Sequence, residues 1–153
     1  MCLQTDQFFL VLYSRNLDIC DLVNATNDGP DQALKALSRR FQESDHRIIA
    51  LSLVVLETCM KNCGTSFASA VQQPFMDELI QIGRGSKGDH HAEEALRLIQ
   101  QWGRAYESKR SRFPLFFDTF MSLKTKGLRF PPEEEGVAAA FDVNKKPYVP
   151  AFI

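Results

Sequence analysis

The sequence predicts an all-α protein, folded as a right-handed superhelix of stacked helices. Several segments repeat their apolar residues at the spacing of a helix that has one face in a core. No run of alternating apolar and polar residues ends in the turn residues of a hairpin, so we expect essentially no strand. The segments follow one another with short connections, which favours a stack of helix pairs over a symmetric four-helix bundle.

A turn signal separates the first two helices. We expect the first over residues 8–25, because Asn27-Asp-Gly-Pro30 places a glycine where a helix ends and a proline where the next one begins. The second helix then runs to about Phe41. Its inward stripe consists of Ala33, Leu34, Leu37 and Phe41.

The third helix is the most apolar. Ser44 or Asp45 is expected to cap its start, and Gly64 is expected to end it. Between Ile48 and Met60, apolar residues occur on nearly all sides, which predicts a helix buried in the middle of the protein.

Further helices complete the domain. Residues 67–82 are expected to form a short helix, a break at Pro74 and an amphipathic helix, followed by the loop Gly83-Arg-Gly-Ser-Lys-Gly88. A strongly patterned helix over residues 90–106 and a last helix over residues 114–126 follow. The inward residues of the 90–106 helix are Ala95, Leu98, Ile99 and Trp102.

The length of 153 residues and the 44% hydrophobic content fit one domain with one core. After Gly127 the composition changes to Pro131-Pro-Glu-Glu-Glu135 and then to small residues, which bury little surface. We therefore assign residues 1–130 to the helical domain and residues 131–153 to a tail or linker.

The charges nearly balance, with 18 Lys and Arg against 19 Asp and Glu, so no global field favours nonspecific adsorption to nucleic acid or membrane. The four cysteines, in a chain without a signal peptide at Met1, indicate cytosolic thiols and not a disulfide framework. No apolar stretch approaches the length of about 20 residues that spans a bilayer. These observations predict a cytoplasmic protein.

The residue spacings in this sequence do not match known catalytic or cofactor-binding motifs. The glycine-rich loop of residues 83–88 lacks the order of a Walker phosphate loop and the strand before it. Cys59, Cys63, His90 and His91 could in principle hold zinc, but they come from different elements without a compact knuckle, so we expect core thiols and no metal. A glycine-flanked nucleophile is also absent from the sequence, and we expect neither enzyme activity nor a cofactor.

An ordered set of motifs resembles one known family. Leu51-Ser-Leu-Val-Val-Leu-Glu-Thr-Cys-Met-Lys-Asn-Cys-Gly64 is similar to the central helix of VHS domains, in the ENTH and VHS superfamily. The same order and rough spacing recur in Asp18-Ile-Cys-Asp21, Gly29-Pro30, Trp102 and Leu123-Lys-Thr-Lys-Gly127. The resemblance runs from about Tyr13 to Pro132 and is to the target-of-Myb and signal-transducing-adaptor types. It implies a non-catalytic adaptor in endosomal protein sorting, peripheral to endosomal or Golgi membranes.

The resemblance also implies a contact with ubiquitin or ubiquitinated cargo. In ubiquitin-binding VHS domains a tryptophan and a leucine precede the Asp-Ile-Cys-Asp segment, and these positions fall on Tyr13 and Leu17. Leu12, Ile19 and Val23 define a more continuous stripe toward the core, so we expect Tyr13 and Leu17 to face outward. The alternative is an incidental surface or core pair. Tyrosine offers less area than tryptophan, which implies weak binding.

The run Phe8-Phe-Leu-Val-Leu-Tyr13 is apolar in every direction around a helix. VHS domains normally carry a separate helix before this one, whereas only 12 residues precede Tyr13, so we expect the family's first helix to be shortened or missing. The run then either packs in the domain's own core or forms an interface, by self-association or with another chain.

Two further candidate ligands are an acidic dileucine peptide and an anionic membrane. Golgi-type VHS domains take acidic dileucine signals in a groove that corresponds to residues 74–82 and 114–126, where Asp77 and Ser122 disfavour an acidic peptide.

A local basic excess suggests a phosphoinositide or anionic-membrane surface, or only a solvated face. Its members are Arg104, Lys109, Arg110, Arg112, Lys124, Lys126 and Arg129. We expect no nucleic-acid partner, because exposed aromatic residues are not interleaved with these charges.

Overall fold

The computed structural model describes residues 15–135, and all of its regular structure is helical. A helix over residues 15–24 is followed by α2 (Gly29–Phe41), α3 (His46–Asn62), α4 (Gly64–Ala70), α5 (Gln73–Gly83), α6 (Asp89–Ala105), the short 3-10 helix η1 (Glu107–Lys109) and α7 (Pro114–Thr125). No strand occurs within residues 15–135, which confirms the all-α prediction. None of the helices within residues 15–135 combines the length and the apolar character that a membrane-spanning segment requires.

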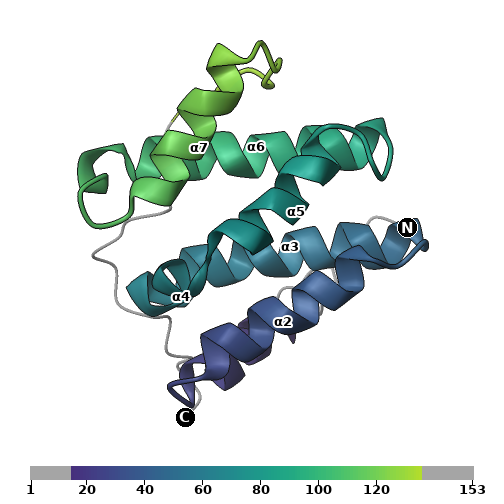
Figure 1. Ribbon diagram of the computed structural model, residues 1–153. Coiled ribbons are helices and arrows are strands. Elements are labelled where there is room, and N and C mark those ends of the chain that lie inside the picture. Colours follow the sequence, from purple (N-terminus) through teal and green to yellow (C-terminus); the bar gives the residue numbers. More distant parts are fainter. Residues whose placement is uncertain (1–14, 136–153) are drawn as a thin grey trace.

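The helices form a stack with α2 near one end and α7 at the other (Figure 1). α3 packs against α2, α4 and α6, while α5 packs against α2 and α6, and α6 in turn packs against α7. Each helix therefore buries surface against two or more neighbours, which is how a superhelix of amphipathic helices builds one continuous core.

Local signals set the helix boundaries as predicted. Asp45 is the residue that caps α3, and its carboxylate accepts a hydrogen bond of 2.9 Å from the backbone N–H of Arg47. At the other end of α3, Gly64 adopts a positive φ of 71°, which a residue with a side chain rarely takes, and the chain turns there into α4. Pro74 lies in the first turn of α5, so the break between α4 and α5 falls just before it.

Aromatic side chains fill the core between α6 and α7. All four predicted inward residues of α6 are buried, and Trp102 is fully so. The Tyr106 ring lies 4.7 Å from Phe116 and 5.1 Å from Phe113, measured between ring centroids, and Trp102 meets Phe116 edge to face at 6.0 Å. Such pairs contribute about 0.5–1.5 kcal/mol each beyond their buried area.

The prediction that α3 is buried on nearly all sides is wrong. Leu51 is 49% exposed and Val54 is 46% exposed. The helices that pack on α3 cover the side that carries Ile49, Leu53 and Leu56, but within residues 15–135 no element covers the side of Leu51 and Val54. An apolar residue in the sequence marks a surface that can be buried, and it does not show that a neighbour is present to bury it.

The residues after α7 return over α6. The side-chain amide of Gln100 donates a 3.0 Å hydrogen bond to the carbonyl of Pro131, and Arg104 forms a 2.7 Å ion pair with Glu133. The ring of Phe130 lies 4.9 Å from that of Phe120. These contacts cross the predicted domain boundary at residue 130, which stays a prediction.

Candidate functional site

The 15–24 helix carries the predicted ubiquitin contact, and the structure corrects its orientation. Leu17 is only 9% exposed, and together with Cys20 and Val23 it forms the face that packs inward. The expectation that Leu17 faces outward is therefore wrong, because the inward stripe runs through Leu17 and Cys20 and leaves Ile19 half-buried. Tyr13 and the apolar run from Phe8 lie outside the described residues, so the predicted self-association is untested.

The outward face of the same helix carries Arg15, Asp18 and Leu22. Leu22 is 73% exposed, more than any other large apolar side chain within residues 15–135. Ile19 precedes it by three residues and is therefore its neighbour on the helix surface. Sequence reasoning missed Leu22, although its place beside the Asp-Ile-Cys-Asp segment was visible.

An apolar groove of about 440 Å³ continues from this face across α2 and α3. Ile19 lines its edge, and most of the remaining wall is apolar and comes from the two neighbouring helices: Ala33, Ala36, Leu37, Arg40, Ile48, Leu51, Ser52 and Val55. We use the name 15–24 surface for exposed Leu22, half-buried Ile19 and the groove that Ile19 shares with Leu51. Exposed apolar patches of this kind are typical of protein-binding sites.

A second groove, of about 700 Å³, lies between α5 and α7, where the sequence placed the family's peptide groove. Asp77 and Ser122 both line it, and Asp118 adds a further carboxylate. Arg84 and Lys126 contribute basic groups, so the charge of the lining is mixed. The groove thus has room for a peptide, but its two carboxylates oppose an acidic one.

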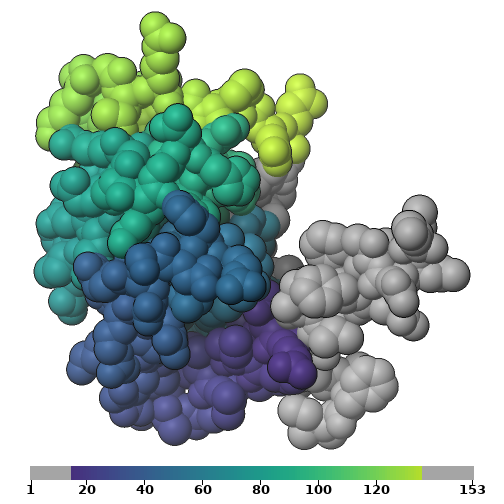
Figure 2. Space-filling view, turned by 90° about the vertical axis from the view of Figure 1, so that its right-hand side faces the viewer, coloured from purple at the N-terminus to yellow at the C-terminus, as the bar shows by residue number. Residues whose placement is uncertain are grey.

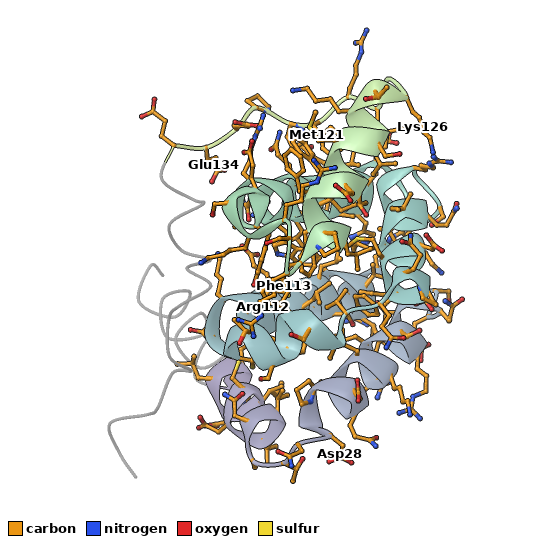
Figure 3. All side chains as sticks on the ribbon, turned by 60° about the vertical axis from the view of Figure 1, so that its left-hand side comes forward. Asp28, Arg112, Phe113, Met121, Lys126 and Glu134 are labelled. Carbon is orange, nitrogen blue, oxygen red and sulfur yellow. The ribbon has the colours of Figure 1, made fainter. Side chains whose placement is uncertain are left out.

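The predicted membrane-binding residues are spread along the chain from the end of α6 to the end of α7. Arg112 precedes α7 and Lys126 follows it, so the 12 residues of that helix, a length of about 18 Å, lie between them. Figure 3 shows the two residues apart. Two of the others are engaged in ion pairs, Arg104 with Glu133 and Arg110 with Asp118, each at 2.7 Å. The local basic excess in the sequence is therefore partly neutralised and spread out in space.

Three cysteines from distant parts of the sequence meet in the core. The sulfur atoms of Cys20, Cys59 and Cys63 all lie within 4.8 Å of one another, and all three residues are fully buried free thiols. Hydrogen bonds from Cys59 and Cys63 lower the pKa of Cys20, and the same bonds raise the pKa of Cys59 and of Cys63, as does burial. Of the three thiols, Cys20 is therefore the one that ionises most readily.

The histidines gather elsewhere, so the conceivable zinc set of Cys59, Cys63, His90 and His91 is not assembled. His46 at the start of α3 stacks on His91 near the start of α6, with a hydrogen bond of 3.0 Å between His46 Nδ1 and His91 Nε2. His91 is only 4% exposed, and its Nδ1 has no partner among the described residues. Burial lowers the pKa of His91, and the neighbouring His46 and His90 lower it further.

This lowered pKa predicts that acid destabilises the fold. Below about pH 6.5 the unfolded chain binds a proton that the folded His91 resists, so the free energy of unfolding should fall as the pH decreases from about 7 to about 5. His91→Gln should flatten this dependence in urea denaturation series. His90→Gln, which removes an exposed histidine from the same turn, should keep the wild-type slope, and equal flattening in both variants would contradict the assignment to His91.

The chain matches the family model of the VHS domain over residues 5–127, and it belongs to this family. It is 33% identical over 131 residues to TOM1-like protein 1 of Arabidopsis thaliana, covering 84% of this chain and 32% of that protein. It is also 34% identical over 125 residues to Target of Myb1 membrane trafficking protein of Gallus gallus, covering 78% of this chain and 24% of the relative. Identity to vacuolar protein sorting-associated protein 27 of Mycosarcoma maydis is 32% over 128 residues, or 81% of this chain and 14% of the relative.

These matches confirm the resemblance read from the sequence, including the target-of-Myb type. The chain spans a third or less of the length of these relatives.

Proposed function

We propose that this chain is a non-catalytic adaptor module of membrane trafficking that recognises ubiquitin, or ubiquitinated cargo, through the 15–24 surface. Its membership in the VHS family supports the adaptor role, as do relatives whose names include membrane trafficking and vacuolar protein sorting. The place of action that follows from this role is the cytoplasmic face of endosomal membranes.

The observation that carries the ubiquitin proposal is the exposure of Leu22. A leucine that is 73% exposed on a well-packed helix contributes little to its own fold and is available to a partner. Arg15 and Asp18 flank it on the same face and supply the polar rim that is typical of protein interfaces. The family's contact pair falls on Tyr13 and Leu17, so the proposed contact shifts by about one helical turn along the same helix, from Leu17 toward Leu22.

The affinity should be low. Burying one leucine side chain contributes about 1.5–3 kcal/mol, which is far less than the roughly 8 kcal/mol of a micromolar complex. The apolar groove beside Ile19 and Leu51 adds area, but much of it is shallow surface between helices. A weak receptor of this kind works through avidity, when a second ubiquitin site supplies a high effective concentration.

Substitution of Leu22 tests the proposal. Leu22→Asp should abolish the binding of ubiquitin, measured by chemical-shift titration, while the melting temperature stays within a few degrees of wild type. Met121→Asp is the matched control, because Met121 is also an exposed apolar residue but lies on α7 (Figure 3). In Figure 2 the green α7 region and the purple 15–24 region lie at opposite ends of the molecule. Undiminished binding by Leu22→Asp would exclude this surface.

Recruitment to an anionic or phosphoinositide-containing membrane is the second candidate. Exposed Arg112, Lys124 and Lys126 favour it, since none of them forms an ion pair within residues 15–135. Each such charge near an anionic leaflet contributes about 1 kcal/mol, but only if the charges reach the surface together. Co-sedimentation with phosphoinositide vesicles that is lost in Lys124→Glu, while ubiquitin binding is retained, would favour this function over the first.

A further inference from the structure

We propose that Cys20, Cys59 and Cys63 form a closed three-thiolate site for a thiophilic ion of low coordination number, with trivalent arsenic as the ion that fits its charge. The three sulfur atoms lie within 4.8 Å of one another, and none of the three residues has any exposed surface. A site of this kind is independent of the ubiquitin proposal, because it lies in the core and not on the 15–24 surface.

The fold places the three ligands by two different means. Cys59 lies in the last turn of α3 and Cys63 follows that helix as its C-cap, so their spacing of four residues puts both thiols on one face. Cys20 is on the inward face of the 15–24 helix, where Leu17 and Val23 anchor the backbone on either side. Two helices with their own core contacts thus hold the sulfur atoms together before any ion binds.

The geometry is close to what three-fold coordination requires. Three sulfur atoms at the usual metal–thiolate distance of about 2.3 Å lie about 4 Å apart when the ion is in their plane, and closer together when the ion sits above the plane, as trivalent arsenic does because of its lone pair. The cluster reaches this arrangement by drawing its sulfur atoms together from separations that do not exceed 4.8 Å. A structural zinc ion requires a fourth ligand, and the candidate group among residues 15–135 contains three residues and no fourth. The site therefore favours soft ions that accept three thiolates.

The net charge of the buried complex determines which of these ions fits best. A buried complex is most stable when its net charge is small, and the carboxylate of Asp21 lies close enough to Cys63 to act against additional negative charge. Three thiolates leave a monovalent ion with two excess negative charges, whereas they neutralise a trivalent ion in full. Arsenous acid, As(OH)3, achieves this by condensation: three As–S bonds form, three As–O bonds break, and each thiol proton leaves with a hydroxyl group as water. The step involves no oxidation and no change of net charge.

Binding should tie the 15–24 helix to the end of α3. Because the sulfur atoms are buried, the ion can enter only when the 15–24 helix opens locally, and the bound ion then holds that helix closed. The expected signature is slow binding accompanied by increased protection of the backbone amides of residues 15–24 from hydrogen exchange.

Intact-mass spectrometry of the reduced, folded protein with arsenite tests the site. Three-thiolate binding adds the mass of one arsenic atom and removes three hydrogen atoms, whereas binding by two thiols retains a hydroxyl group on arsenic. We expect the first mass change at one equivalent, and X-ray absorption showing three sulfur neighbours at about 2.3 Å.

Cysteine substitutions identify which thiols bind the arsenic. Cys20→Ala and Cys63→Ala should each lose the three-thiolate adduct, while Cys2→Ser, which removes the remaining cysteine of the chain, should keep it. If an alanine variant does not fold, prolonged alkylation of the wild type decides. Without arsenite, local opening of the 15–24 helix should let Cys20, Cys59 and Cys63 react slowly, whereas with arsenite these three should stay unmodified and the modification of Cys2 should not change. A hydroxyl-retaining adduct, an adduct lost in Cys2→Ser, or no adduct would show that the cluster is an ordinary part of the core.

Discussion

Gly103→Ala should destabilise the domain by about 1–3 kcal/mol, although alanine is the better helix former. Gly103 is buried in α6 where that helix meets α7, and a Cβ atom there would lie 2.5 Å from Cβ and 2.8 Å from Cγ of Phe120. These atoms belong to the base of the Phe120 side chain, and its ring contacts both Phe130 and the guanidinium of Arg104. The contact can be relieved only by moving α7 away from α6.

Gly83→Ala is the matched control for this prediction. A Cβ at Gly83 would meet the terminal Cδ2 of Leu96 at 2.9 Å, and a leucine terminus can turn aside. The gain in helix propensity, about 1 kcal/mol, should offset that adjustment. Urea denaturation of the two variants should therefore give a clear loss for Gly103→Ala and little change for Gly83→Ala. Equal effects would contradict the close packing of α6 on α7.

Leu17→Asp should unfold the domain or cost about 3 kcal/mol or more, because it places a carboxylate in the core beside Cys20, and no Lys or Arg among residues 15–135 is buried there to pair with it. Leu22→Asp, on the same helix but outward, should change the free energy of unfolding by less than about 0.5 kcal/mol. Thermal melts followed by circular dichroism distinguish the two.

Comparing the stability of Leu17→Asp and Leu22→Asp shows which leucine supports the fold and which is available to a partner. A Leu17→Asp variant that melts like the wild type would show that Leu17 is a surface residue and would return the ubiquitin contact to the pair Tyr13 and Leu17. A Leu22→Asp variant that unfolds would remove the reason for assigning Leu22 to a partner.

Sequence alone predicted the features that depend on neighbours along the chain. The inward stripe of α6 follows from helical spacing, and Asp45 caps α3 through a bond to a residue two positions away. The VHS family was also readable, because its motifs occur in a fixed order.

Features that depend on how the helices pack against one another could not be predicted from the sequence. The rotation of the 15–24 helix was ambiguous, since apolar residues on several sides allow more than one inward stripe, and the choice of Leu17 as an outward residue was wrong. The meeting of Cys20 with Cys59 and Cys63 depends on the docking of two helices far apart in sequence. The basic residues between Arg104 and Lys126 are close in sequence, yet α7 holds Arg112 and Lys126 apart.

The most direct measurement is a titration of the isotope-labelled wild-type protein with ubiquitin, followed at every backbone amide. We predict that the shifts concentrate at residues 15–22 and at the residues of α2 and α3 that line the adjoining apolar groove. Shifts that instead concentrate at the groove between α5 and α7, or no shifts with ubiquitin but clear ones with phosphoinositide vesicles, would contradict recognition of ubiquitin by the 15–24 surface.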